Sequence, residues 1–269
     1  MDHEEKISLV LSGGGARGAF QIGVWKAMRE LGMDKSITNV FGTSVGAING
    51  AAIVQGDFEL AIKIWENIDY SKVFSDVNLS MAERRSRKYY YSFAKALIRD
   101  RGLNVEPLKE MLRDVLDERL LRNSPIDFGL VVFDLSNKRT KYLKKSQIPK
   151  GKLIEYIIAS ATFPLFQPHR IEDQVFMDGG IADNRPLQFL SREENVSRVI
   201  CVDVTIARHF WPNKKVNKNI EVEYLRPSRL LGSPLAFRNV RIKRNLDLGF
   251  TDALKRLDRS DRTDKFSRR

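Results

Sequence analysis

Two short glycine-rich turns near the start of the chain each join a predicted strand to a predicted helix. The first, residues 13–18, follows the apolar run 7–11 and precedes residues 19–31, where apolar side chains recur at helical spacing. The second, residues 42–46, also follows apolar residues and leads into a helix of small residues, 44–54. This alternation of strand and helix predicts a parallel sheet in an α/β fold.

The second turn carries a Gly-x-Ser-x-Gly pattern made by Gly42, Ser44 and Gly46. A serine held in a sharp strand-to-helix turn adopts strained backbone angles, which only small neighbours accommodate. Ser44 would then stand at a helix N-terminus, where free N–H groups and the helix dipole favour developing negative charge. The pattern predicts that Ser44 is a nucleophile, with an ordinary tight turn as the alternative.

The first turn can offer backbone N–H groups from its glycines: Gly13, Gly14, Gly15 and Gly18. Its spacing also fits a dinucleotide-binding turn, but that site needs an acidic residue at the end of the next strand, where this chain has the hydroxyl of Ser44. A Walker site is excluded because no Gly-Lys-Ser/Thr follows the glycines. The turn is therefore predicted to donate hydrogen bonds to an oxyanion. We expect Arg17 to stiffen the turn or to meet an anionic head group, and we favour the first role.

A nucleophilic serine needs a base. The chain contains three histidines: His3, His169 and His209. His3 lies close to the terminus, and the other two are interpreted as surface or packing residues. The stronger candidate is Asp178, because a carboxylate at a strand end followed by Gly179 and Gly180 can approach another backbone and accept a proton directly from serine. A hairpin turn is the alternative interpretation of Asp-Gly-Gly.

Taken in chain order, the three motifs resemble those of the patatin-like phospholipases. Residues 159–168 and 183–186 resemble the segments that the family has before and after its catalytic acid, and the match extends over residues 6–205. The resemblance implies a three-layer α/β/α fold with a mostly parallel central sheet. It also implies roles for the motif residues: Ser44 and Asp178 as a catalytic dyad, Gly13, Gly14 and Gly15 as the oxyanion hole, and Arg17, Gly18, Gly42, Gly46, Gly179 and Gly180 as supporting positions.

The implied activity is hydrolysis of acyl esters of phospholipids or lysophospholipids, with no cofactor and no metal. An aspartate is a weak base at its reference pKa of about 3.9, so the dyad requires a short, partly desolvated contact. Two alternatives stay open. A triad esterase would use His209 as its base, although that fold usually places its nucleophile after more strands than precede Ser44. A non-catalytic nucleic-acid-binding protein would leave the esterase motifs unexplained.

Composition is compatible with one sizeable core, since 42% of the 269 residues are hydrophobic. We expect a catalytic domain over residues 6–205, with residues 206–269 as a basic helical extension packed on it. The single cysteine, Cys201, excludes an internal disulfide and is interpreted as a packing residue in a buried strand. Without a signal-like or membrane-spanning apolar run, we expect a cytoplasmic protein that can associate peripherally with a membrane.

Positive charge is concentrated toward the C-terminus. Residues 207–269 hold 17 Lys and Arg against 7 Asp and Glu, so ten of the twelve net charges lie there. Within them, residues 235–257 have the pattern of one or two amphipathic helices with a cationic outer face. A second basic patch with tyrosines, from Arg84 to Tyr91, and the basic C-terminus both suit an anionic membrane surface. The patch would equally suit RNA or DNA phosphates, and a solvated helix face or a mobile lid is the alternative. We favour membrane contact because the catalytic motifs indicate a lipid ester. We expect no specific nucleic acid as a partner.

The middle of the chain is interpreted as supporting structure. Residues 104–121, with a proline near the start and one apolar face, predict a single helix. Residues 128–135 and 140–143 predict a hairpin added to the sheet, and residues 152–161 predict a short helix.

Overall fold

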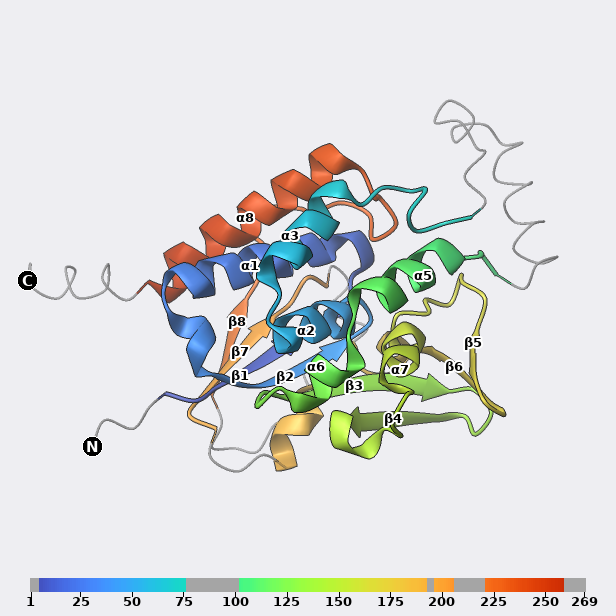
Figure 1. Ribbon diagram of the computed structural model, residues 1–269. Helices are drawn as coiled ribbons and strands as arrows, with labels where there is room; N and C mark the ends of the chain where they lie inside the picture. The colour runs from blue at the N-terminus through green and yellow to red at the C-terminus, as the bar shows by residue number, and fades with distance from the viewer. Residues whose placement is uncertain (1–4, 76–101, 193–195, 206–220, 259–269) are drawn as a thin grey trace, which may run out of the picture.

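The computed structural model describes residues 5–75, 102–192, 196–205 and 221–258. The helices of these segments pack on a single β-sheet (Figure 1). The described part of the chain contributes eight strands: β1 (Ile7–Leu11), β2 (Ile37–Thr43), β3 (Asp127–Asp134), β4 (Arg139–Lys144), β5 (His169–Ile171), β6 (Gln174–Asp178), β7 (Arg198–Val202) and β8 (Val222–Leu225). Their order across the sheet is β5-β6-β3-β2-β1-β7-β8, and β4 also pairs with β3.

The sheet is parallel over most of its width. Strands β3, β2, β1, β7 and β8 run parallel to their neighbours, whereas β4, β5 and β6 pair in the antiparallel sense at the β3 side. The turns after β1 and β2 therefore lie at the same edge of the sheet, which is where α/β proteins place their ligands. The antiparallel pairing of β6 with β3 sets Asp178 opposite Val132, beside the parallel strands.

Helices form the layer on one face of the sheet (Figure 1). They are α1 (Ala19–Glu30), α2 (Val45–Gln55), α3 (Phe58–Asn67), α5 (Glu106–Val115), α6 (Glu118–Asn123), α7 (Leu153–Ser160) and α8 (Asn239–Leu257). Alternate strand residues such as Leu9, Leu130 and Ile200 point into the core that these helices share with the sheet. Because both faces of a parallel sheet need cover, these strands are apolar almost throughout.

The opposite face of the sheet has a thinner cover. The 3₁₀ segment η6 (Leu187–Arg192) packs Leu187 and Phe189 against Phe41 and Cys201, and the rings of Phe41 and Phe189 stack with centroids 4.5 Å apart. The predicted three-layer α/β/α architecture with a mostly parallel sheet is thus confirmed. Cys201 is fully buried in β7, as predicted.

Helix α8 lies along the outer side of α1 (Figure 1). The two backbones approach closely at a pair of glycines. A Cβ on Gly23 of α1 would overlap the carbonyl oxygen of Leu246, and one on Gly249 of α8 would overlap that of Phe20. The C-terminal helix is therefore fitted to the core through contacts that no larger residue can make. No helix of the described residues is long and apolar enough to cross a membrane.

The predicted elements agree with the structure except in the middle of the chain and before α8. The single helix expected over residues 104–121 is two helices, because Asp117 accepts hydrogen bonds from the amides of Arg119 and Leu120 and so caps a new helix. Helix α3 was not predicted. The amphipathic pattern of residues 235–257 becomes helical only at Asn239, since the residues before it form a loop. The Arg84–Tyr91 patch, His3 and His209 lie outside the described residues.

Candidate active site

Ser44 occupies a strained turn between β2 and α2. Its φ of 59° lies in the left-handed region, which non-glycine residues adopt at a cost. The turn is tight enough to require glycine on either side: a Cβ on Gly42 would overlap the Gly46 carbonyl, and one on Gly46 would overlap the Leu11 carbonyl. The sequence pattern therefore corresponds to a real steric requirement, and it leaves the Ser44 side chain at the N-terminus of α2.

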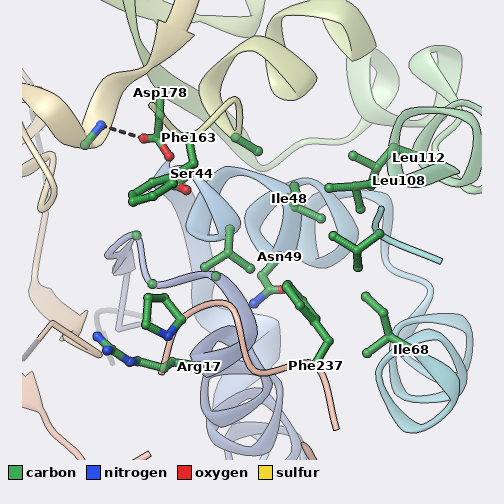
Figure 2. A pocket seen from close by; sticks show the side chains of 18 of the residues that line it. Arg17, Ser44, Ile48, Asn49, Ile68, Leu108, Leu112, Phe163, Asp178 and Phe237 are labelled. Carbon is green, nitrogen blue, oxygen red and sulfur yellow. Dashed lines mark hydrogen bonds between the residues drawn. The ribbon is translucent and has the colours of Figure 1, made fainter. Parts of the chain in front are cut away.

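Asp178 ends β6 and lies beside Ser44 (Figure 2). Its amide donates to the Thr162 carbonyl at 2.8 Å, and one carboxyl oxygen accepts from the Gly180 amide at 2.7 Å. The side chain is almost completely buried. Burial raises the pKa of Asp178 to about 6, while hydrogen bonding from the Ser44 side chain and the Gly180 amide opposes that rise. The carboxyl is consequently a better base than an ordinary aspartate and is still ionised at neutral pH.

The first glycine turn lies next to Ser44. The amide of Gly13 donates to the Asn184 carbonyl at 3.2 Å, and the amide of Ala16 donates to the Pro234 carbonyl at 2.7 Å. Between them, the amides of Gly14 and Gly15 have no hydrogen-bond acceptor within the described part of the chain. Of the three predicted oxyanion donors, Gly13 is thus engaged, whereas Gly14 and Gly15 have amides that no described residue accepts. Gly15 also has a φ of +56°, where a Cβ would overlap the Pro234 carbonyl.

The Arg17 side chain points away from Ser44 (Figure 2). Its Nε donates to the Gly232 carbonyl at 2.8 Å, and partial burial lowers the pKa of the guanidinium. Together with the bond from Ala16 to Pro234, this contact fixes the glycine turn to the loop that precedes α8. Gly18 completes the turn against α2, since a Cβ there would overlap the Val45 side chain.

Two further side chains position the site and were not singled out from the sequence. Ser160 donates its hydroxyl to the Val131 carbonyl at 2.7 Å and accepts the Ser44 amide at 3.1 Å. Asn184 donates its side-chain amide to the Gly13 carbonyl at 3.3 Å and to Thr205 at 2.8 Å. Both lie in stretches that carried the family resemblance, so the signal was present, but their partners are too far away in sequence to be inferred from it.

An apolar cavity of about 640 Å³ extends from Ser44 and Asp178 between α2, α3 and α5. Its wall includes these side chains: Ile48, Ala52, Ile68, Leu108, Leu112 and Phe237. The buried amide of Asn49 is fully engaged: it donates to the Gly18 carbonyl and to Gln21, and it accepts from Trp65. Beyond the polar groups beside Ser44, the cavity is therefore suited to a hydrocarbon chain, and its volume lies in the range of small-molecule sites.

His169, the one candidate histidine among the described residues, does not belong to the site around Ser44. His169 is the first residue of β5 and is buried, with its Nε2 2.8 Å from a Glu155 carboxyl oxygen. It does not line the cavity. Burial lowers the pKa of this histidine and raises that of the Cys201 thiol. Among the described residues, no group of three or more His, Cys, Asp or Glu side chains could hold a metal ion.

Comparison with known proteins connects this geometry to a family. A family model described as patatin-like phospholipase matches residues 9–191. An uncharacterized NTE family protein of Mycobacterium tuberculosis is 27% identical over 243 residues, which cover 90% of this chain and 60% of that protein. Patatin-like phospholipase domain-containing protein 6 of Homo sapiens is 27% identical over 215 residues, which cover 74% of this chain and 13% of that protein. The chain thus spans well under the full length of these relatives.

Solved structures share the fold. VipD from Legionella pneumophila superposes with a TM-score of 0.59 at 17% identity, over 95% of this chain and 67% of that one. Human group IVD cytosolic phospholipase A2, solved with a fluorophosphonate inhibitor, superposes with a TM-score of 0.51 at 13% identity, over 94% of this chain and 58% of that one. At these identities the likeness concerns the arrangement of the sheet and its helices.

Proposed function

The chain belongs to the patatin-like phospholipase family, and from this premise we propose that it hydrolyses fatty-acyl esters of phospholipids or lysophospholipids with Ser44 as nucleophile and Asp178 as base. One observation carries the proposal: Ser44 and a buried carboxyl of raised pKa lie together at one end of a large apolar cavity. A polar reaction centre joined to a long hydrocarbon-lined space matches a substrate with an ester at the end of an acyl chain.

In the proposed reaction the Ser44 hydroxyl oxygen attacks the ester carbonyl carbon and passes its proton to Asp178. The Gly14 and Gly15 amides donate to the oxyanion of the tetrahedral intermediate. The protonated carboxyl then gives its proton to the departing alcohol, leaving an acyl ester on Ser44. Asp178 next deprotonates a water molecule that attacks this ester, and returns the proton to Ser44 as the fatty acid leaves. The proposed steps use no cofactor and no metal.

The substrate class follows from what lines the cavity. An acyl chain can contact aliphatic and aromatic side chains along its whole length. Gly14 and Gly15 line the same cavity as Ser44, and in the proposed complex their amides would donate to the ester carbonyl oxygen. The head group would then remain near the mouth, where Phe163 and Ile181 line the cavity and are partly exposed. We further propose that the protein acts from the cytoplasm, at the surface of a membrane that supplies the substrate.

The test compares hydrolysis of a short-chain p-nitrophenyl ester and of phospholipid vesicles by wild type and variants. Ser44→Ala and Asp178→Asn should each lower kcat/KM on both substrates by roughly a thousandfold or more. Asp173→Asn, an exposed aspartate in the same hairpin, is the matched control and should stay active. An inactive His209→Ala would favour the triad alternative instead. Full activity of Ser44→Ala would refute the proposal outright.

A further inference from the structure

The surface around the loop before α8 has an excess of positive charge, although exposed Asp247 follows Arg244 on the helix and Asp252 accepts hydrogen bonds from Ser228. From residue 224 to 246 the chain has no Asp or Glu but six basic residues: Arg226, Arg229, Arg238, Arg241, Lys243 and Arg244. Arg229, Lys243 and Arg244 are exposed, and within the described residues none of the three forms an ion pair with a carboxylate. This part of the molecule therefore presents more cationic than anionic side chains to solvent.

Two aliphatic side chains stand among these charges. Leu230 is 79% exposed and Val240 is 86% exposed, far more than the other exposed large hydrophobic residues of the described chain. They belong to one surface, because the Arg244 guanidinium donates to the Leu230 carbonyl at 3.0 Å and Val240 lies one helical turn before Arg244. Ile242 and Leu246, on the other side of α8, are buried. We call Arg229, Leu230, Val240, Lys243 and Arg244 the α8 surface.

We propose that the α8 surface docks on an anionic lipid bilayer. Exposed aliphatic side chains flanked by Lys and Arg match an interface in which the apolar groups enter the acyl boundary and the cations meet anionic head groups. Nucleic acid fits this surface less well, because single-stranded binding uses aromatic side chains on which bases stack, and the apolar members here are Leu and Val. A protein partner would not by itself require this excess of positive charge around exposed aliphatic side chains.

The α8 surface is connected directly to the candidate active site. The loop between Leu230 and Val240 accepts hydrogen bonds from Ala16 and Arg17 through the carbonyls of Pro234 and Gly232. In the same loop, Pro234, Leu235 and Phe237 line the cavity. A membrane bound at Leu230 and Val240 would thus lie beside the wall of the acyl cavity. Docking would then bring lipid close to the site that binds it, an argument that rests on the proposed function.

The experiment separates binding from hydrolysis. Full-length protein carrying Ser44→Ala is sedimented with vesicles of phosphatidylcholine alone or mixed with phosphatidylserine. Neutralising the three charges, by Arg229→Gln, Lys243→Gln and Arg244→Gln, should weaken partitioning to the anionic vesicles by about a hundredfold, since each cation contributes about fivefold. Leu230→Ser with Val240→Ser should weaken it by roughly tenfold. The matched control is Arg119→Gln with Leu120→Ser, an exposed cation and leucine on α6, remote from α8 (Figure 1).

Each result decides the proposal. Anion-dependent binding that the α8 variants lose and the α6 control keeps supports it, provided that thermal unfolding shows the α8 variants to be as stably folded as the parent Ser44→Ala protein. Binding unchanged in the α8 variants overturns it, as does equal binding to neutral vesicles. Tighter binding of a nucleic-acid oligonucleotide than of anionic vesicles also overturns it. Wild type that binds vesicles but hydrolyses no ester would retain the docking surface while contradicting the proposed function.

Discussion

At the scale of single residues, the candidate site depends on a carboxyl kept out of water. Burial of Asp178 raises its pKa to about 6, which brings its basicity closer to that needed for taking a proton from serine at neutral pH. The same burial has a cost in stability, because the folded protein must hold a desolvated carboxylate at the pH where it works. Function and stability are therefore opposed at this position.

Replacing Asp178 by Asn should stabilise the protein in a pH-dependent way. The folded-state pKa lies above the unfolded value, so the unfolded chain loses this proton first as pH rises from about 4 to about 6. Below that pH range the carboxyl is protonated in both the folded and the unfolded protein, so its ionisation does not lower the free energy of unfolding. Above the range it is ionised in both, and the full destabilisation is present. Asp178→Asn should raise the free energy of unfolding by on the order of 2 kcal/mol at pH 7.5, with a gain near zero at pH 3.5.

Urea denaturation at several pH values measures this effect. Asp173→Asn, at an exposed position, serves as the control and should show little change across the range. A gain for Asp178→Asn of the same size at every pH would mean that packing, rather than removal of a buried charge, causes the stabilisation.

The residues that could be predicted were those whose role is local. Gly42, Ser44 and Gly46 lie within one turn, so the sequence pattern alone indicated the strained turn that holds Ser44. The contacts of Ser160 with Ser44 and of Asn184 with Gly13 join residues 116 and 171 positions apart, and only the folded sheet brings them together. The same holds for Gly13, whose amide is occupied by the segment after Asp178.

At the scale of elements, α2 both presents Ser44 and forms one side of the cavity. Ile48 and Ala52 follow Ser44 at intervals of one helical turn and line the cavity in succession, and α3 and α5 form the facing wall. An acyl chain bound at Ser44 would thus extend beside α2. The sequence predicted that Ser44 begins a helix, but it did not predict the cavity, because α3 was not predicted and the apolar face of α5 is equally typical of a core helix.

Enlarging Ala52 should shorten the acyl chains that the protein accepts. In Ala52→Phe the ring would fill the cavity about two turns from Ser44, so kcat/KM on long-chain p-nitrophenyl esters should fall by roughly tenfold or more, while the short-chain ester is cleaved as by wild type. Ala52→Ser, which hardly changes the volume, should keep the long-chain activity. Equal loss on short and long chains would indicate damage to the fold or to Ser44 rather than a shortened cavity.

At the scale of the whole molecule, the C-terminal part of the chain completes the site. Helix α8 packs on α1, and the loop before α8 accepts hydrogen bonds from the glycine turn that precedes α1. Charge and amphipathicity predicted a helix in this region, but they did not reveal that the preceding loop forms part of the cavity wall. That assignment needs the contact of Gly15 with Pro234, which lies more than two hundred residues away in the sequence.

Because α8 meets α1 through glycines, a single added methyl group should disturb both stability and activity. In Gly249→Ala the new Cβ would overlap the Phe20 carbonyl oxygen, and α8 would have to move outward, which should destabilise the protein by about 1–3 kcal/mol. The shift would also move the loop that holds the glycine turn, so kcat on the soluble ester should fall even where the protein is fully folded.

Thr251→Ala, at an exposed position on the same helix, is the control and should change neither the stability nor kcat appreciably. Thermal unfolding and ester hydrolysis, measured on both variants, test this; if Gly249→Ala matched Thr251→Ala in both, the packing of α8 on α1 would not support the site.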